Sequence, residues 1–420
     1  MSILLLHTKN LSRRRHLARA RDYAREHGER LLLIVKEPTW EHEYVDRVVL
    51  ADTTSIPETV EVAKRLAEEE TEPIRAVLTF VEHSVPSAAA VAAEFGLPHV
   101  SPRTAYIARD KYAMREAFAE AGNVPQPRFG LARTVEEAKK VAETVGYPLI
   151  LKPFIGGGSM YVRSIENEAE LDEFFDFIRD GAWDGFDYDP LYRDAVEEYG
   201  LAILVEEFVP GVEISVESLV VNGETHCIAI HDKPLPTGPY FEEVYACTPT
   251  RLSPEQVDVL YAATAAAHKA LGIDTGATHV EFRLRDGKEP VILEAAARLG
   301  GGPIYRSVQL STGVDMVEGV LDLAMGRTPV VEPWEKPVWT GFRNIFPSEA
   351  GKLTEITGLP EADADPNVHD IEIYRKPGDF LNVPPHTFQG HGHVMFTADS
   401  EAELDKRFDG LLRSIRFLVE

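Results

Sequence analysis

Cysteine is scarce in this sequence, which has only Cys227 and Cys247 among its 420 residues. Two cysteines are too few for a disulfide framework or for a four-ligand zinc site. A chain without structural disulfides fits a reducing compartment, so we expect a cytoplasmic protein. Its stability must then come from hydrophobic cores, and the length is enough for two or three of them.

Positive charge is also in short supply, because 43 Lys and Arg residues stand against 69 Asp and Glu residues, for a net charge of −26 at neutral pH. This balance argues against nucleic acids and anionic membranes as partners. The first apolar run, Ser2–Leu6, is too short for a signal-peptide core or a membrane span.

A Gly-x-Gly-x-x-Gly sequence is missing after the first apolar run, so no dinucleotide site is expected there. The first hundred residues nevertheless alternate apolar runs with helical patterns, which predicts βαβ units around a small parallel sheet. The predicted strands are Ile3–Leu6, Leu31–Val35, Val48–Leu50 and Ala76–Val81, and the predicted helices are Ser12–Glu26, Pro57–Glu70 and Val85–Phe95. Six arginines from Arg13 to Arg25 make the first helix basic, either as a solvated face or as a phosphate or partner site.

A glycine loop follows a short predicted strand near residue 150. That strand, Leu149–Lys152, ends in a lysine, and Gly156–Gly158 come directly after it. The loop joins two strands rather than a strand and a helix, so it differs from a P-loop. Its consecutive backbone N–H groups can surround phosphate oxygens as a flap, although a plain hairpin turn is the alternative.

Two alternating apolar runs, 278–283 and 291–297, are separated by a polar turn with Asp286-Gly287, which predicts a β-hairpin. Glu281 and Glu294 fall on the paired strands, where two neighbouring carboxylates would repel each other and be costly to desolvate. A hard cation such as Mg²⁺ would remove that conflict. Arg298 follows four residues after Glu294 and could pair with an anion beside the metal. A solvated acidic hairpin is the alternative.

The pattern changes again near residue 330, where three closely spaced prolines precede short strands and a helix over 400–417. We predict an α/β and α+β protein with a Rossmann-like domain at 1–103, a second domain at 104–330 and an α+β module at 331–420. The second domain would divide into a flap-bearing part, about 125–205, and a lobe, about 206–330. An acidic and aromatic segment, 178–199, predicts an insertion or a surface helix pair.

The succession of these pieces resembles the ATP-grasp superfamily over nearly the whole chain. The resemblance is carried by Asp110-Lys111 at a helix start, Lys152 before the flap, the Glu206–Glu213 segment, the Glu281 and Glu294 pair, and Arg298. The N-terminal and C-terminal parts look like the biotin-carboxylase-like arrangement, and residues 294–301 are similar to L-amino-acid ligases, the dipeptide synthetases. The resemblance implies an ATP-grasp fold and an ATP-dependent carboxylate–amine ligase that forms an amide bond through an acyl phosphate and releases ADP and phosphate.

The resemblance also implies roles for individual residues. Lys111 and Lys152 would contact ATP phosphates, with Gly157, Gly158 and Ser159 closing over them. Glu206 would lie by the adenine amino group, the backbone of Glu207, Phe208 and Val209 would pair with the base edge, and Glu213 would hold the ribose. Glu281 and Glu294 would hold Mg²⁺, with Mn²⁺ as a substitute, while Arg298 and Lys152 would act in catalysis. Many members carry Asn two residues after the second glutamate, where this chain has Ala296, so a second magnesium would lack one ligand.

The substrates would be a small carboxylate and an amine of the amino-acid type. Tyr240 and Glu242, in the loop 231–243, could contact them, as could Gly301, Gly302 and Ser307; ordinary surface loop residues are the alternative. Three functions stay open: the ligase, a biotin- or bicarbonate-type carboxylase subunit, and an inactive nucleotide-binding protein. A homodimer is an assembly to test by analogy with relatives.

Overall fold

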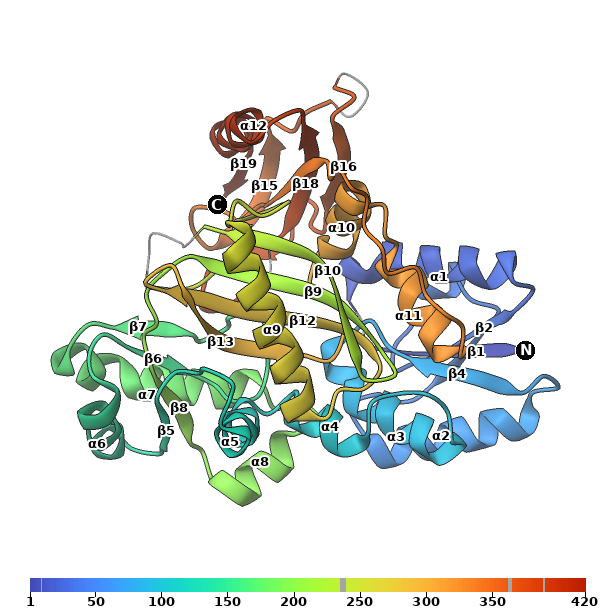
Figure 1. The fold of residues 1–420 in the computed structure, drawn as a ribbon, viewed down its shortest axis with the longest axis horizontal. Coiled ribbons are helices and arrows are strands. Elements are labelled where there is room, and N and C mark those ends of the chain that lie inside the picture. The colour runs from blue at the N-terminus through green and yellow to red at the C-terminus, as the bar shows by residue number, and fades with distance from the viewer. Residues whose placement is uncertain (9, 235–238, 362–364, 388–389) are drawn as a thin grey trace.

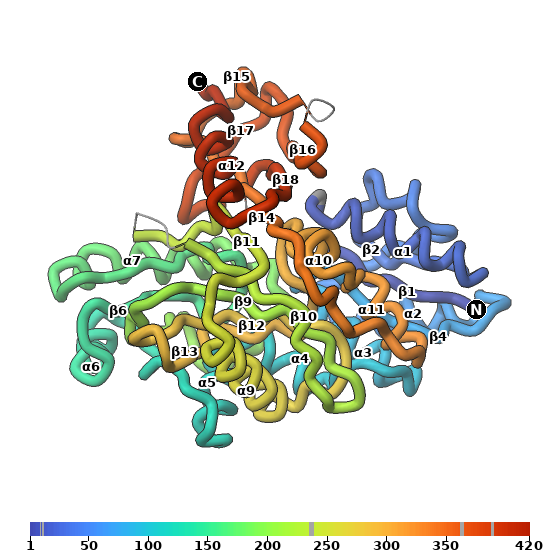
Figure 2. The backbone as a smooth tube through the Cα atoms, turned by 45° about the horizontal axis from the view of Figure 1, so that its top comes forward, coloured from blue at the N-terminus to red at the C-terminus, as the bar shows by residue number. Residues whose placement is uncertain are grey.

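The structure, a computed structural model, describes residues 1–8, 10–234, 239–361, 365–387 and 390–420. Figure 1 shows the N-terminal residues in blue beside a central sheet, the green segments on its other side, and the C-terminal residues in red above it. Figure 2 separates the same lobes after a turn about the horizontal axis. In the described part of the chain, no helix has the length and apolar character needed to cross a bilayer.

The N-terminal lobe is a parallel sheet, as predicted, and its strands lie in the order β3-β2-β1-β4. Its elements are β1 (Ser2–His7), α1 (Arg14–Glu26), β2 (Arg30–Val35), β3 (Arg47–Leu50), α2 (Ile56–Glu69), β4 (Ile74–Leu78) and α3 (Val85–Phe95). The strands are continuous apolar runs because both faces are covered: Leu5 packs with α1, whereas Leu4 packs with α2 and α3.

The flap-bearing part is a four-stranded sheet in the order β5-β8-β6-β7. Its elements are β5 (Phe129–Ala132), α6 (Val135–Val145), β6 (Leu149–Lys152), β7 (Arg163–Ile165), α7 (Glu168–Gly185), α8 (Tyr192–Tyr199) and β8 (Ile203–Glu207). The segment 178–199 contains the end of α7 and the whole of α8. Of the two predicted alternatives, an insertion or a surface helix pair, it therefore matches the helix pair. Its apolar residues, among them Ile178 and Phe186, are buried in the core of this part.

The largest sheet has eight strands in the order β13-β12-β9-β10-β11-β14-β18-β16. The first five strands are β13 (Glu289–Ala296), β12 (Gly276–Arg285), β9 (Glu213–Val221), β10 (Glu224–Lys233) and β11 (Tyr245–Thr248). The last three, β14 (Trp339–Asn344), β18 (Gly392–Ala398) and β16 (Val368–Ile373), come from the C-terminal part. The predicted boundary near residue 330 is therefore crossed by one continuous sheet.

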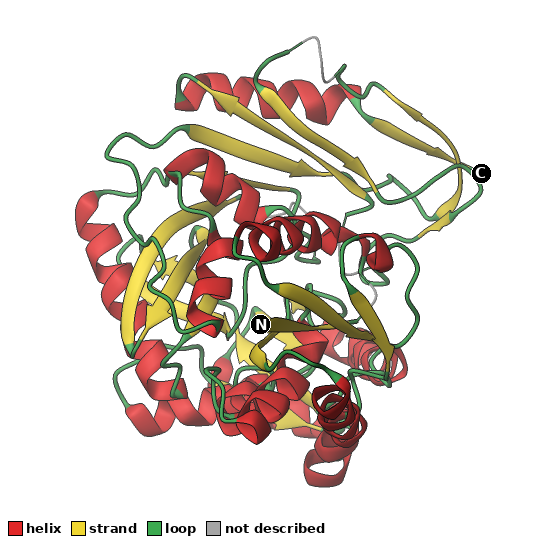
Figure 3. Cartoon of the chain, turned by 90° about the vertical axis from the view of Figure 1, so that its right-hand side faces the viewer, coloured by secondary structure: helices red, strands yellow, loops and turns green. Residues whose placement is uncertain are grey.

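Helices and short strands complete the lobes. They are α4 (Pro102–Ile107), α5 (Lys111–Ala121), α9 (Pro254–Leu271), α10 (Ile304–Thr312), α11 (Met316–Ala324), β15 (Gly351–Thr357), β17 (Phe380–Leu381), α12 (Glu401–Ser414) and β19 (Arg416–Val419). The helix α12 lies along the C-terminal strands (Figure 3), with Leu404 buried against them. It ends earlier than predicted, because residues 416–419 pair with β15 as a strand that the sequence analysis missed.

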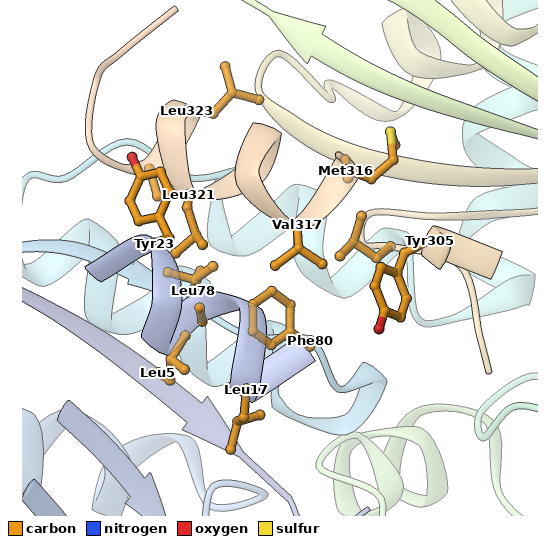
Figure 4. Packing of buried hydrophobic residues seen from close by; sticks show 14 of the residues in the cluster. Leu5, Leu17, Tyr23, Leu78, Phe80, Tyr305, Met316, Val317, Leu321 and Leu323 are labelled. Atoms are coloured by element: carbon orange, nitrogen blue, oxygen red, sulfur yellow. The ribbon is translucent and has the colours of Figure 1, made fainter. Parts of the chain in front are cut away.

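One apolar cluster joins the N-terminal lobe to the large sheet. Leu17 and Tyr23 of α1, Phe80 after β4, and Val317 and Leu321 of α11 meet there (Figure 4), and each is at most 1% exposed. The two lobes therefore share a close-packed core, which fixes the loops that both present to the region between them.

Candidate functional site

The predicted acidic pair lies on facing strands. In the antiparallel ladder of β12 and β13, Glu281 is directly opposite Glu294. Each carboxylate has a cationic partner: the Lys233 Nζ is 2.7 Å from Glu281 Oε1, and the Lys111 Nζ is 3.3 Å from Glu294 Oε2. Although burial alone would raise it, Lys233 and His279 hold the pKa of Glu281 well below its usual value. Both predicted metal ligands are thus brought together.

A buried histidine supports this pair. The His279 Nδ1 is 2.7 Å from Glu217 Oε1, and its Nε2 is 3.2 Å from Glu281 Oε1. Burial opposes its charge, but Glu217 and Glu281 raise the pKa of His279 to about 9. The imidazole is therefore protonated at neutral pH. Because His279, Glu281 and Arg283 alternate on one strand, they share a face, and period-two spacing could have identified them as a group.

A cavity of about 100 Å³ opens on one side of the pair. Its charged lining consists of Lys111, Lys152, Glu206, Glu207, Glu213, Glu281, Arg283 and Glu294, and the flap residues Gly157–Ser159 cover it. The Lys152 Nζ is 2.6 Å from Glu206 Oε2, and burial lowers the pKa of Lys152 to about 8. The second oxygen of Glu206 accepts from Arg115 Nε at 2.6 Å. Both carboxylate oxygens of Glu206 are therefore already engaged.

The segment at the end of β8 and directly after it lines part of this cavity. Glu207 and Val209 line it, and the Arg283 guanidinium donates to the Val209 carbonyl at 3.0 Å and to Glu213 Oε2 at 2.9 Å. The same guanidinium lies 5.2 Å from the centroid of the Phe208 ring. Arg283, which the sequence analysis did not single out, thus fixes the segment whose backbone was predicted to meet a base.

A larger cavity, of about 360 Å³, lies on the other side of the pair. The two cavities share Gly157–Ser159, Glu281 and Glu294 as a common wall. Arg298 lines only the larger one, where it forms an ion pair with Glu82 at the end of the N-terminal lobe. The acidic pair therefore sits at the passage between two binding spaces.

The base of the flap is anchored by a buried ion pair. Arg109 pairs with Asp189, and its Nη1 also donates to the Gly156 carbonyl at 3.1 Å. The Gly156 amide donates to Asp189 Oδ2 at 3.2 Å. A Cβ at Gly156 would lie 2.5 Å from the Phe186 ring, and its φ of +85° is unfavourable for other residues. Only glycine fits this hinge position without a shift of its neighbours.

The structure separates the predicted substrate residues into two groups. Glu242, Gly301 and Gly302 line the larger cavity. Ser307 does not: it is fully buried in α10, with its hydroxyl bonded to His231 and to the Ile304 carbonyl. Tyr240 also lines neither cavity; its ring lies against the guanidinium of Arg163, 5.3 Å away. Residues 235–238 of the predicted substrate loop lie outside the described part.

The acidic pair suits a divalent cation that shares its shell with another molecule. The carboxylates of Glu281 and Glu294 supply hard oxygen ligands, as Mg²⁺ prefers. They leave the remaining coordination positions of the ion for phosphate oxygens and water. Among the described residues, no group of three or more His, Cys, Asp and Glu side chains is placed to hold a metal. An ion held by Glu281 and Glu294 would thus depend on a bound ligand.

Comparisons with known proteins agree with this geometry. Residues 145–305 match the ATP-grasp domain, and residues 343–420 match the L-amino acid ligase C-terminal domain 2. An uncharacterized protein of Sinorhizobium fredii is 28% identical over 93% of this chain and 77% of its own length. The alanine–anticapsin ligase of Bacillus subtilis is 28% identical over 66% of this chain and 60% of its own length. The crystal structure of an L-amino acid ligase from Bacillus licheniformis superposes with a TM-score of 0.81, at 23% identity, over 100% of this chain and 98% of that one.

Proposed function

This chain is an ATP-grasp ligase that carries the C-terminal domain of the L-amino acid ligases, and from that premise we propose that it joins the carboxyl group of one amino acid to the amino group of another. The carboxylate would be activated as an acyl phosphate, with release of ADP and then phosphate. The observation that carries the proposal is the acidic pair on the wall between two cavities. That wall is where a phosphoryl group would pass from nucleotide to acid.

The smaller cavity is the proposed nucleotide site. Lys111, Lys152 and the flap amides would bind the phosphates, and the Glu207–Val209 backbone would meet the base, as the resemblance implies. Glu213 would hold the ribose, and Glu206, which pairs with Lys152, would lie by the adenine amino group. When bound to Glu281 and Glu294, Mg²⁺, or Mn²⁺ as a substitute, would neutralise phosphate charge. The proposed ligands are the two carboxylates of Glu281 and Glu294, and Ala296 stands where many members of the superfamily carry a further ligand. These residues support one such ion more strongly than two.

The larger cavity is the proposed site of amide formation. A free carboxylate resists attack by an amine because oxide would have to leave, whereas an acyl phosphate expels phosphate. The protein's task is then positioning and charge neutralisation. Arg298 would hold the transferred phosphoryl group and the oxyanion formed when the amine attacks. The flap would exclude water, which otherwise hydrolyses the acyl phosphate.

Two carboxylates in the larger cavity are available for an ammonium group. Glu242 Oε2 and Glu243 Oε1 are buried and have no hydrogen-bond partner, while the other oxygen of Glu243 lies 3.6 Å from the Lys233 Nζ. Such oxygens are costly to desolvate and favour a cationic partner. We assign them to the α-ammonium group of the acid substrate, which an amino acid retains when its carboxyl group is activated.

The broader setting remains proposed as well. The negative net charge and the two free cysteines support a cytoplasmic enzyme that binds neither nucleic acid nor membrane. The predicted domains at 1–103, 104–330 and 331–420, and a homodimer, are proposals that limited proteolysis and light scattering would test. The carboxylase alternative is not favoured, because the C-terminal domain matches that of L-amino acid ligases.

Incubation with ATP, Mg²⁺ and pairs of L-amino acids tests the proposal. We expect ADP and phosphate in equal amounts, together with a dipeptide-mass product, only when a suitable pair is present. AMP and pyrophosphate would contradict it, and turnover that requires bicarbonate would indicate a carboxylase. Tight ADP binding without turnover on any pair would indicate a nucleotide-binding protein instead.

A further inference from the structure

Arg13 is a buried cation on the wall of the larger cavity. It ends a single 3-10 turn, Leu11–Arg13, between β1 and α1, and is 4% exposed. Its Nη1 donates to the Gly300 carbonyl and contacts His16 Nε2, both at 3.1 Å, while its Nε has no partner. A guanidinium that is nine-tenths buried and belongs to the wall of a cavity is arranged to meet an anionic ligand.

The other arginines at the start of α1 have partners in the protein. Arg15 pairs with Asp370 and Glu372, and Arg19 pairs with Asp315. These ion pairs connect the N-terminal lobe to the rest of the chain, so the basic residues of α1 do not form only a solvated face. Within the described part of the chain, Arg13 forms no ion pair, which leaves its charge without a counterion.

Burial, and then the neighbouring Arg298, lower the pKa of Arg13 to about 10, so its guanidinium is still charged at neutral pH. Burial, and then Arg13 itself, keep the pKa of His16 well below its usual value, so the imidazole is neutral and can accept the hydrogen bond. Burial likewise lowers the pKa of His7 to about 4. Glu82, a carboxylate whose charge acts on Arg13, already pairs with Arg298 and Arg109.

Arg13 therefore has no carboxylate of its own. Glu82 and Asp189 are engaged by Arg109 and Arg298. The other carboxylates that line the larger cavity, those of Glu242, Glu243, Glu281 and Glu294, form no ion pair with Arg13 in the described part of the chain. An uncompensated buried charge is costly, and an anionic ligand would remove that cost. The planar fork of arginine suits a carboxylate, which it can bind through two hydrogen bonds.

We propose that Arg13 binds the carboxylate of the amine substrate, so that this substrate must be an amino acid rather than a simple amine. The inference rests on the proposed function. The carboxylate that reacts loses its charge on activation and belongs at the shared wall, which Arg13 does not line. The carboxylate of the attacking amino acid stays charged throughout and needs a permanent counterion. The acid substrate would instead place its ammonium group by Glu242, away from a guanidinium that would repel it.

The position of Arg13 is fixed by packing on both sides. Leu17 and Tyr23, on the helix that follows it, lie in the apolar cluster between the lobes (Figure 4). Gly300, which accepts its hydrogen bond, has room for no side chain, since a Cβ would lie 2.7 Å from Ile304 and 3.0 Å from Glu217. The Arg13 side chain is thus held in place and can position the second substrate.

The test compares an amine substrate with its neutral counterpart. The best acid–amine pair from the amino-acid panel is assayed with the amine partner as the free amino acid and as its α-carboxamide, in wild type, Arg13→Gln and Arg13→Lys. Loss of a charge-assisted pair is worth about 10- to 100-fold. We expect the KM for the amino acid to rise by that factor in Arg13→Gln, the KM for the carboxamide to change less than about threefold, and Arg13→Lys to recover part of the loss.

Arg14→Gln is the matched control, because Arg14 neighbours Arg13 but its side chain is 53% exposed and outside the cavity. ADP affinity, which depends on the smaller cavity, reports whether each variant is folded. If Arg13→Gln no longer binds ADP, the comparison of amino acid and carboxamide is made with Arg13→Lys instead. An unchanged preference for amino acid over carboxamide, or an equal loss with both, would overturn the assignment while leaving the ligase intact. A wild-type protein that binds ADP but ligates no pair would instead overturn the proposed function, and this inference with it.

Discussion

The charge of Lys152 should control nucleotide binding in alkaline solution. Its side chain is 9% exposed, and burial lowers its pKa from 10.5 to about 8 despite the neighbouring Glu206. That shift corresponds to roughly 3 kcal/mol against the charged form. A bound phosphate would favour the ammonium and return the pKa toward its ordinary value.

The expected consequence is proton uptake on binding. At pH 7 Lys152 is already protonated in the free protein, so ADP binding should take up almost no proton at this group. At pH 9 about nine-tenths of the free protein has lost this proton, so binding should take up nearly one, and affinity should fall by up to about tenfold per pH unit above 8. In the unfolded chain Lys152 binds more protons than in the folded one between pH 8 and 10.5, so its contribution to folding stability rises with pH over that interval.

Calorimetric titration with MgADP in two buffers of different ionisation enthalpy measures the uptake directly. Lys152→Arg is the matched control, because a guanidinium stays protonated at pH 9. We expect the uptake of wild type to exceed that of Lys152→Arg by about 0.8 proton at pH 9 and to equal it at pH 7. Equal uptake by both proteins at pH 9 would refute the argument that Lys152 is poised by burial to meet phosphate.

Three further predictions concern catalysis and stability. Arg298→Ala should lower turnover by about 10²- to 10³-fold while leaving ADP affinity within about threefold, since Arg298 lines the larger cavity and not the proposed nucleotide site. Steady-state ADP release and calorimetry check this, and normal turnover would contradict the assigned role. Glu294→Gln should abolish magnesium-dependent turnover and keep a cooperative melt by circular dichroism, because it removes a ligand charge without removing volume; activity at ordinary magnesium concentrations would argue against the metal site. Leu321→Ala, at a fully buried position between the lobes, should lower the free energy of unfolding by about 2–5 kcal/mol in urea denaturation, and a change below about 1 kcal/mol would show that this contact contributes little.

Local patterns predicted the centre of the site well. The Asp286-Gly287 turn sets the register of β12 and β13, which places Glu281 opposite Glu294 as expected. The parallel order of the first sheet and the strand–flap–strand arrangement after Lys152 also followed from short-range spacing. Such features depend on neighbours in sequence or on one hairpin, where turn chemistry and alternation decide the outcome.

Contacts between segments that are far apart in the sequence could not be predicted from such local patterns. Arg13 and Glu82 meet Gly300 and Arg298 only because the N-terminal lobe packs on α11, and Asp189 reaches the flap from a separate helix pair. No spacing within one element signals these pairings. Ser307 lies near the glycine run that indicated a site, but it is buried in α10 and its hydroxyl is bonded to His231 and to the Ile304 carbonyl.

The route of the carboxylate oxygen tests the central claim most directly. The acid substrate is labelled with ¹⁸O in both carboxylate oxygens and converted with ATP and its amine partner, and the released phosphate is measured by mass spectrometry. Transfer of the γ-phosphoryl group to a carboxylate oxygen, followed by cleavage of the carbon–oxygen bond on amine attack, predicts one ¹⁸O atom in each phosphate and none in ADP. Unlabelled phosphate, or label recovered in AMP, would show that the acid is not activated as an acyl phosphate.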